Sequence, residues 1–490
     1  MALTTPPAYP ADWLQRFDLS DEPADSNDPR SAFAHDRDRI IYSSAFRRLA
    51  GKSQVVSAYE RGNFHTRLTH TLKVAQLGRR VAEHLRLMIA GEQMGGQDRI
   101  LAPDPDLIEA ACLAHDLGHP PFGHLGEQTL NERVDSQLER LNQEWKPGRI
   151  TDCGGFQGNA QTFRILSYLG VRDGGRPRTG LNLTKATLAA TVKYQWTRAQ
   201  SPRGEGDRDK WGAYGPNDRE HLAEVVAPQK PKYLVDPTFE AQVMDWCDDV
   251  TYAVHDLIDF FQSGHIPLDR LLAFRTGGRE LSVEAVTFLE EVAAYRDETK
   301  SQHRRIYDRD EIVAAWRMVA ECSFIVEPWV PKYASKVAVQ KTTNELIAKL
   351  IENVGWAERG TGDSRDFNYR DGLPLLYDGD FVVDPDPDLH HRKRLAVALL
   401  KYLFRFRVIQ RPPLQSQQIG QKRIVGELLD AHVDDHGKLL PEDRLEELED
   451  DHHDVVRAAC DHVASLAEDD AVAMFGRITG TRLGAFSDVM

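Results

Sequence analysis

The sequence predicts an all-α fold in which helices are joined by long loops. Apolar residues recur at the three- and four-residue spacing that places them on one face of a helix, whereas the alternation typical of strands is scarce. Stretches rich in glycine, proline, aspartate and asparagine separate these segments, and such residues end helices and form turns. Both observations favour a core made by helices packed on helices.

Three helices are expected in the first half of the chain, each with an apolar stripe along one face. Their apolar positions are, in order, Leu72, Leu77, Val81 and Leu85; Leu107, Ile108 and Ala111; and Val243, Cys247, Val250, Val254, Leu257 and Phe261. Further helical spacing covers residues 394–408 and 445–474. The expected loops are residues 5–30, 91–105, 170–180, 198–230 and 358–388.

The chain of 490 residues, with 41% hydrophobic and 28% charged residues, has the composition of an ordinary globular protein. We expect a flexible N-terminal segment over residues 1–30 and a core over residues 31–270. Residues 271–490 would form a helical C-terminal region packed on that core.

Composition and charge exclude several classes of protein. The net charge of −15 disfavours nonspecific attraction to nucleic acid or to anionic membranes. Residues 1–13 do not resemble a secretory signal, and the longest apolar stretch, residues 395–404, is interrupted by Lys401 and too short to cross a bilayer. The five cysteines are scattered without a CxxC pair, which argues against a zinc knuckle or a disulfide framework. We therefore expect a cytoplasmic protein with reduced thiols.

The dipeptide His-Asp occurs four times, and only the copy at His115-Asp116 has a distinctive context. It follows an apolar helical segment and runs into a turn that also contains His119 and His124. Three histidines and an aspartate thus fall within ten residues, beside glycines and prolines that bend the chain. This segment is the first candidate for a divalent-metal site.

A divalent cation needs several nitrogen and oxygen ligands, and two other segments offer them. His70 stands at the end of an apolar helical stripe, where a merely buried or capped histidine is the alternative. Asp248, Tyr252 and Asp256 follow one another at four-residue spacing, so a helix places them on one face. The alternative for this face is simple exposure to solvent.

Taken together, these blocks resemble the HD-domain deoxyguanosine triphosphate triphosphohydrolases and their broader dNTPase relatives, over about residues 42–259. The resemblance rests on five blocks in the same order. These are Phe46-Arg47-Arg48-Leu49 with Gln54; Arg67 with His70; residues 115–127; residues 158–161; and Asp248-Asp249 with Tyr252 and Asp256. It implies an HD-domain helical architecture, with residues 31–270 as the phosphohydrolase core.

The resemblance also implies a ligand set and a catalytic pair. The metal ligands would be His70, His115, Asp116 and Asp248, with Asp249 as the alternative to Asp248. Two imidazoles and two carboxylates suit a divalent metal such as Mn, Mg, Fe or Co. His124 and Glu127 look like the catalytic pair in which the histidine gives a proton to the leaving 5′ oxygen, and His119 looks like a secondary active-site residue.

Substrate-binding residues follow from the same resemblance. Arg67, Lys193, Lys232 and Tyr252 would contact phosphates, whereas Gln54 and Asp256 look like the pair that binds the 3′-hydroxyl group. The family reaction is attack of water at the α-phosphorus of a deoxynucleoside triphosphate, dGTP or several dNTPs, which releases the deoxynucleoside and tripolyphosphate. Relatives assemble as homo-oligomers, often hexamers, and some respond to a dNTP or to single-stranded DNA; no membrane partner is expected.

Two features of the sequence depart from simple expectations. Gln157 precedes Gly158 where an acidic residue would be expected from the resemblance. The tripeptide Gly51-Lys52-Ser53 resembles the end of a nucleotide-binding P-loop, but Phe46 stands where that motif needs its first glycine.

Other functions remain open at this point. One alternative is an HD phosphohydrolase that acts on nucleoside monophosphates, cyclic nucleotides or guanosine polyphosphates. Another is a nucleotide-sensing or single-strand DNA-binding protein with a vestigial site.

Overall fold

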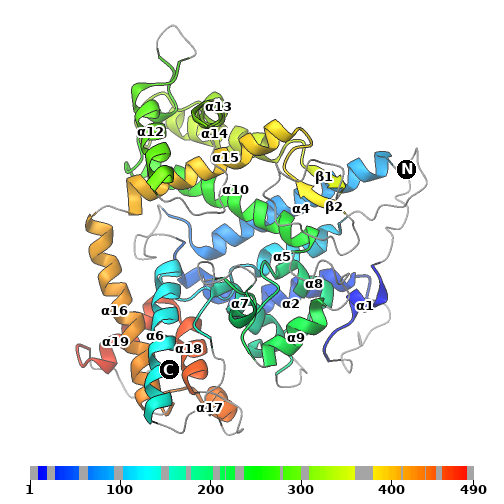
Figure 1. Ribbon diagram of the computed structural model, residues 1–490, viewed down its shortest axis with the longest axis vertical. Coiled ribbons are helices and arrows are strands. Elements are labelled where there is room, and N and C mark those ends of the chain that lie inside the picture. The colour runs from blue at the N-terminus through cyan, green and yellow to red at the C-terminus, as the bar shows by residue number, and fades with distance from the viewer. Residues whose placement is uncertain are drawn as a thin grey trace.

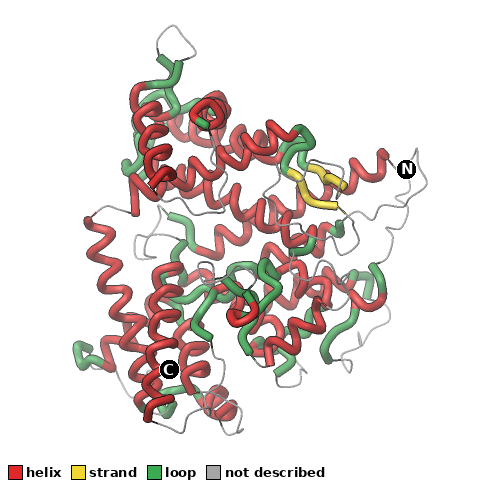
Figure 2. Tube along the Cα trace, viewed as in Figure 1, coloured by secondary structure: helices red, strands yellow, loops and turns green. Residues whose placement is uncertain are grey.

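The computed structural model describes most of the chain, with gaps at both ends and in several connecting segments. The described residues are 9–18, 28–54, 64–92, 103–144, 154–172, 178–201, 210–215, 217–226, 237–275, 280–298, 308–358, 379–409, 412–435, 437–448 and 455–482. Helices dominate this part of the chain, which confirms the all-α prediction (Figures 1 and 2). Its paired strands are β1 (Gly355–Glu358) and β2 (Gly379–Val382), an antiparallel pair with Trp356 opposite Phe381.

Three long helices form the centre of the molecule: α4 (Arg67–Glu92), α5 (Pro105–Ala114) and α10 (Phe239–Gln262). They pack on one another, and α2 (Ala32–Tyr42) and α8 (Lys185–Thr191) cover α5. These elements correspond to the three helices expected from the sequence. Their stripes are buried except at Leu72, which is 48% exposed because its side chain projects from the outer face of α4.

Local sequence explains where α5 begins and ends. The side chain of Asp104 accepts a hydrogen bond from the backbone N–H of Asp106, and Pro105 occupies the first helical position, which favours proline. His115 follows as the C-cap, and Gly118 comes in the turn beyond it. A Cβ atom at Gly118 would lie 2.2 Å from the backbone nitrogen of Thr162, so glycine lets this turn approach the neighbouring helix.

The C-terminal half forms two groups of helices (Figure 1). The first, at the top of the figure, consists of α12 (Val283–Glu298), α13 (Arg309–Glu321), α14 (Tyr333–Ile351) and α15 (Pro387–Phe404), of which α14 and α15 pack on α10. The second consists of α16 (Pro412–Asp434), α18 (Val455–Ser465) and α19 (Glu468–Ile478). Here α16 and α18 pack against α6 (Gly123–Glu144), and α19 packs on α16.

Shorter elements complete the fold. They are α1 (Ala11–Leu14), α3 (Ser44–Arg48), η1 (Leu49–Gly51), α7 (Gly158–Arg164), the π-helical turn η2 (Ile165–Leu169), η3 (Arg198–Gln200), α9 (Asn217–Val226), α11 (Leu268–Leu271), the π-helical turn η6 (Arg405–Ile409) and α17 (Glu442–Leu448). The expectation of loops was wrong for α1, η3, α9 and β2. Helix α9 buries Leu222 and Val225 despite its polar surroundings in the sequence.

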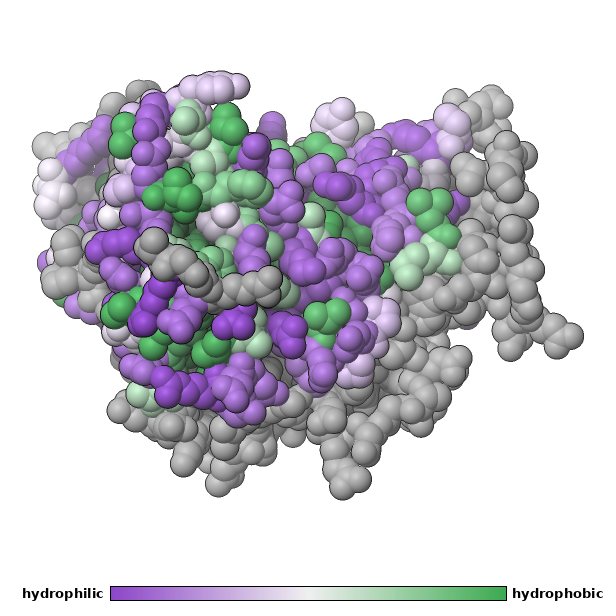
Figure 3. Space-filling view, turned by 90° about the horizontal axis from the view of Figure 1, so that it is seen from above, coloured by the Kyte–Doolittle hydropathy of each residue, from purple (hydrophilic) through white to green (hydrophobic). Residues whose placement is uncertain are grey.

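The two largest hydrophobic cores among the described residues hold these groups together. The larger takes residues from Tyr9 to Val408 and so joins the helices on both sides of the boundary expected near residue 270. The smaller joins α6 to α16, α18 and α19 through residues such as Leu130, Leu428 and Val463. The outer surface at the α12–α15 end is mainly hydrophilic with scattered apolar patches (Figure 3). The three-part division of the chain stays a prediction.

Leu85 and Leu87 offer a matched test of the larger core, because they lie on one helix with 0% and 71% of the residue exposed, respectively. Leu85→Ala is expected to lower the free energy of unfolding by about 2–5 kcal/mol, since it removes buried methyl groups and leaves a cavity. Leu87→Ala should change it by less than about 0.5 kcal/mol. Urea unfolding of both variants measures the difference, and equal losses would contradict this packing.

Candidate metal centre and active site

Three distant segments bring potential metal ligands to one point. His70 lies in the first turn of α4, His115 caps the end of α5, and Asp248 lies in the middle of α10. One ligand atom from each of these residues lies within 4.8 Å of the other two. The Nε2 atom of His70 is 3.0 Å from Oδ1 of Asp248, and Nε2 of His115 is 3.5 Å from that oxygen.

Asp116 adds a second carboxylate to this group. Its Oδ1 atom lies 3.5 Å from Nε2 of His115, and its Oδ2 atom accepts a hydrogen bond of 2.7 Å from Arg67. Burial by itself would raise the pKa of Asp116, but His115, Arg67 and His119 outweigh that effect and hold it well below its ordinary value. The carboxylate is therefore ionised inside the protein. Of the four residues expected to bind metal, His70, His115 and Asp248 form one close group, and Asp116 adjoins it beside His115.

The hydrogen bond made by Nδ1 of His115 leaves its Nε2 atom available as a metal ligand. Its Nδ1 atom lies 2.7 Å from the backbone carbonyl of Cys112, which can only accept, so Nδ1 carries the proton. In the neutral ring, Nε2 then points a lone pair at Asp116 and Asp248. Burial lowers the pKa of His70, which favours its neutral form, whereas the charges of Asp116 and Asp248 outweigh burial at His115 and raise its pKa. This donor set fits a divalent cation.

The structure distinguishes Asp248 from its neighbour Asp249. Asp248 faces His70 and His115, whereas Asp249 pairs with Lys401 of α15 at 2.5 Å. Asp245, Asp248 and Asp249 also lie close enough to hold an ion, but Lys193 is 2.8 Å from Asp245 and, with Lys401, already balances the charge of that acidic cluster. Of these three aspartates, Asp248 is the one whose carboxylate lies beside both His70 and His115.

The predicted catalytic pair lies at the start of α6. Nδ1 of His124 is 3.0 Å from Oε2 of Glu127, and the imidazole is 75% exposed. The other oxygen of Glu127 accepts hydrogen bonds from the backbone of Gly158 at 2.8 Å and from the amide of Gln157 at 3.0 Å. Burial would raise the pKa of Glu127, but the hydrogen bonds with His124 and Gly158 outweigh it and lower the pKa to about 2.

His119 connects this pair to the expected metal ligands. Its Nδ1 atom is 3.0 Å from Oδ1 of Asp116, and its ring centre is 5.6 Å from that of His124. The departure at Gln157 also has a physical reason here. Its amide donates to Glu127 while its oxygen caps α7 by accepting from the backbone of Asn159 at 2.5 Å. A carboxylate at this position would repel Glu127.

Of the expected substrate-binding residues, Arg67 and Lys193 contact the carboxylates of this group. Oε1 of Gln54 and Oδ2 of Asp256 are buried and lack hydrogen-bond partners among the described residues. Burial raises the pKa of Asp256 well above its ordinary value, and the charge of Asp259 adds to this effect. Lys193 lies 3.1 Å from Oδ2 of Asp248, which places it beside the ligands. Lys232 lies outside the described residues.

Comparisons with known proteins agree with this geometry. Residues 67–147 match the model of the HD domain, and residues 389–477 match that of the phosphohydrolase-associated domain. A deoxyguanosinetriphosphate triphosphohydrolase-like protein of Streptomyces coelicolor is 34% identical over 97% of this chain and 99% of its own length. One of Bifidobacterium longum is 32% identical over 91% of this chain and 82% of its own. This chain belongs to the deoxyguanosinetriphosphate triphosphohydrolase-like family.

Within this triphosphohydrolase-like chain, sequence reasoning missed Lys401 as a residue of the site. Its ammonium group pairs with Asp249 and lies 5.9 Å from the ring centre of Tyr252. Tyr252 also packs edge-on against Phe404 of the same helix. The signal for Lys401 was its position, because it interrupts the longest apolar stretch of the sequence. Helix α15, which lies in the phosphohydrolase-associated domain, thus contributes to the wall of the site.

A second group of charged residues, also missed, lies beside the site of this triphosphohydrolase-like chain. Nδ1 of His65 is 2.5 Å from Asp259, and Lys73 is 3.1 Å from Nδ1 of His255. Lys73 also contacts His65.

Among the described residues, no helix is both long enough and apolar enough to cross a membrane.

The pair Asp248 and Asp249 gives a test of the metal ligands. Asp248→Asn is expected to weaken Mn²⁺ binding by about 100-fold or more, because loss of a ligand costs at least as much as loss of a group that supports one. Asp249→Asn should leave Mn²⁺ affinity near that of the wild type, since that carboxylate pairs with Lys401. Calorimetric titration with Mn²⁺ measures both, and the reverse order would assign the ligand to Asp249.

The low pKa of Glu127 predicts a pH-dependent contribution to stability. Because its folded pKa is about 2 against an ordinary value of 4.5, the ionised form stabilises the protein above pH 4.5. This contribution is lost as the pH falls through 4.5 toward 2. The stability difference between wild type and Glu127→Gln should therefore be larger at pH 7 than at pH 4. Urea unfolding at both pH values measures it, and a difference independent of pH would refute this prediction.

Proposed function

We propose that this chain is a deoxynucleoside triphosphate triphosphohydrolase that uses a divalent metal. It would hydrolyse dGTP or several dNTPs to the deoxynucleoside and tripolyphosphate. The observation that carries the proposal is the link from His70, His115, Asp116 and Asp248 through His119 to the exposed His124. A phosphate bound at the first group would have a proton donor beside it.

The metal would be held by His70, His115, Asp116 and Asp248. A set of two imidazoles and two carboxylates suits Mn, Mg, Fe or Co better than a sulfur-rich site would. When bound, the metal would lower the pKa of a water molecule and offset charge on the phosphoryl group. Lys193 and Arg67, which flank the two carboxylates, add positive charge for the triphosphate.

His124 would act as the general acid. Attack of water at the α-phosphorus forms a new P–O bond and breaks the bond to the 5′ oxygen, which then needs a proton. Because Nδ1 of His124 is held by Glu127, its Nε2 atom is the nitrogen that can deliver this proton. The carboxylate of Glu127, ionised because of its low pKa, holds the imidazole in place through its contact with Nδ1.

Recognition of the sugar would fall to Gln54 and Asp256. Their buried oxygen atoms lack partners in the part of the chain that the structure describes, and leaving such atoms unpaired in the complex costs free energy. A 3′-hydroxyl group would pair with them, and Tyr252 would contact a phosphate. Homo-oligomer formation, including hexamers, and regulation by a dNTP or by single-stranded DNA stay predictions.

The reaction is tested by incubating the pure protein with each of the four dNTPs and Mn²⁺. We expect deoxynucleoside and tripolyphosphate from dGTP or from several dNTPs, and loss of turnover when a chelator removes the metal. Separation of the phosphate products by ion exchange distinguishes the outcomes. Pyrophosphate, orthophosphate or no product from all four would exclude the proposal and favour another HD phosphohydrolase or a nucleotide-binding role.

The role of His124 is tested by His124→Ala. We expect kcat to fall by about 10²–10⁴-fold, because the leaving oxygen loses its proton donor, while Mn²⁺ affinity is unchanged. His84→Ala, which removes an exposed histidine from α4, is the control and should leave kcat near the wild-type value. Steady-state kinetics and Mn²⁺ titration separate the two effects. Loss of Mn²⁺ binding in His124→Ala would instead make His124 a ligand.

A further inference from the structure

The tripeptide Gly51-Lys52-Ser53 lies where the core meets the corner between α18 and α19. A Cβ atom at Gly51 would be 2.7 Å from Cβ of Ala467, so glycine permits this close approach. The side chain of Lys52 is almost completely buried, with the residue 1% exposed. Its ammonium group donates to the carbonyl of Ala464 at 2.8 Å and also to the carbonyl of His119. Lys52 therefore joins the end of α18 to the active-site turn.

Glu468, the first residue of α19, makes the second connection. It is fully buried, and one carboxylate oxygen accepts three hydrogen bonds. The donors are the backbone of Ser53 at 3.0 Å, the hydroxyl of Ser53, and the backbone of Phe122 at 3.2 Å. A residue more than 300 positions away thus fixes a backbone group two residues before His124.

The turn that these residues hold is strained. Phe122 has a φ of +64° and Gly123 a φ of +58°, so two successive residues adopt the left-handed conformation that favours glycine. A phenylalanine keeps this conformation only where the surroundings enforce it. The carbonyl of His119 and the N–H of Phe122 are the two ends of the turn that the junction engages.

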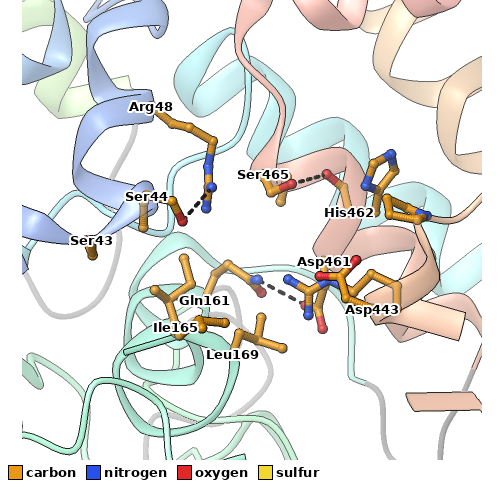
Figure 4. Close-up of a pocket in the computed structure, with 16 residues that line it drawn as sticks. Ser43, Ser44, Arg48, Gln161, Ile165, Leu169, Asp443, Asp461, His462 and Ser465 are labelled. Atoms are coloured by element: carbon orange, nitrogen blue, oxygen red, sulfur yellow. Dashed lines mark hydrogen bonds between the residues drawn. The ribbon is translucent and has the colours of Figure 1, made fainter. Parts of the chain in front are cut away.

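Packing near the junction is incomplete, which increases the importance of its polar contacts. A cavity of about 220 Å³ opens between α3, η2 and α18, lined by Arg48, Ile165 and His462 among others (Figure 4). Arg48 donates to Ser44 of its own helix rather than across the cavity. Gln161 donates to Asp461 at 2.9 Å and is the cross-connection drawn in this view.

We propose that Lys52, Ser53 and Glu468 are positioning residues through which the C-terminal helices set the geometry of the turn carrying His119 and His124. The proposal rests on the proposed function for its kinetic consequence, but its structural part does not. Among the described residues, the hydrogen bonds of these three side chains reach the backbone of the turn, and none of them reaches a proposed metal ligand. Loss of the junction should therefore lower kcat more than it raises KM, and it should leave Mn²⁺ affinity unchanged.

The test compares Glu468→Ala, Glu468→Gln and Asp469→Ala in the full chain. For Glu468→Ala we expect about a 100-fold fall in kcat for dGTP, since displacement of a catalytic group by about 1 Å has effects of that size. KM and Mn²⁺ affinity should stay within about threefold of the wild-type values, a small change beside the expected fall in kcat. Glu468→Gln should restore most of kcat, because its amide oxygen can accept the same bonds. Asp469 is exposed in the same turn of α19 and controls for the lost charge.

Hydrogen–deuterium exchange of peptides covering residues 117–125 gives a readout independent of catalysis. Exchange in this turn should be faster in Glu468→Ala than in wild type or Glu468→Gln. If wild-type protein releases no tripolyphosphate, the proposed function fails while this exchange experiment still tests the junction. If Glu468→Ala does not fold, Ser53→Ala removes only the hydroxyl donor and should still accelerate exchange.

Three results would overturn the proposal. One is a kcat of Glu468→Ala within twofold of wild type. Another is unchanged exchange in the turn for the folded variant. The third is a loss of activity that Glu468→Gln does not rescue and that is matched by loss of Mn²⁺ binding, which would make Glu468 a general stabilising residue.

Discussion

The structure depends on balancing two carboxylates among the central helices, that of Asp116, which is buried, and that of Asp248, which is partly buried. Asp116 and Asp248 stand where α4, α5 and α10 meet, and each has a cationic partner, Arg67 or Lys193. Removal of one member of the buried Arg67–Asp116 pair would leave an uncompensated buried charge, which typically costs about 3–5 kcal/mol. The packing of the central helices therefore also sets the electrostatics of the site, because the same residues take part in both.

The same balance explains how the C-terminal region joins the site. Helix α10 presents Asp245, Asp248 and Asp249 on adjacent positions, and like charges so close together repel one another. Lys193 from the core and Lys401 from α15 pair with these acids. Because Lys401 comes from the phosphohydrolase-associated domain, that domain completes the charge balance of α10 as well as covering its apolar face.

Sequence reasoning could predict features that depend on local spacing. The three central helices follow from apolar periodicity, and the order of the motifs pointed to residues that the structure brings together, such as His70, His115 and Asp248. Periodicity could not reveal α9, whose ten residues carry few apolar positions within a polar stretch. Periodicity also placed Leu72 on the buried face of its helix, although this residue is 48% exposed in the structure.

Sequence spacing could not predict which distant residues contact one another in the fold. Lys401 and Glu468 lie far along the chain from the groups they contact, and nothing in their local sequence names Asp249 or Phe122 as partners. Gln157 is intermediate, because its departure from the expected acid was visible in the sequence. Its reason, the hydrogen bond to Glu127, became visible only in three dimensions.

The exposure of His124 has a consequence for the supply of protons. Three quarters of its imidazole surface contacts solvent, although its partner Glu127 is largely buried. As the proposed general acid, this ring would regain its proton directly from bulk water, whereas a buried acid would depend on a relay of internal groups. Recovery of the acid between turnovers would then need no opening of the protein around it.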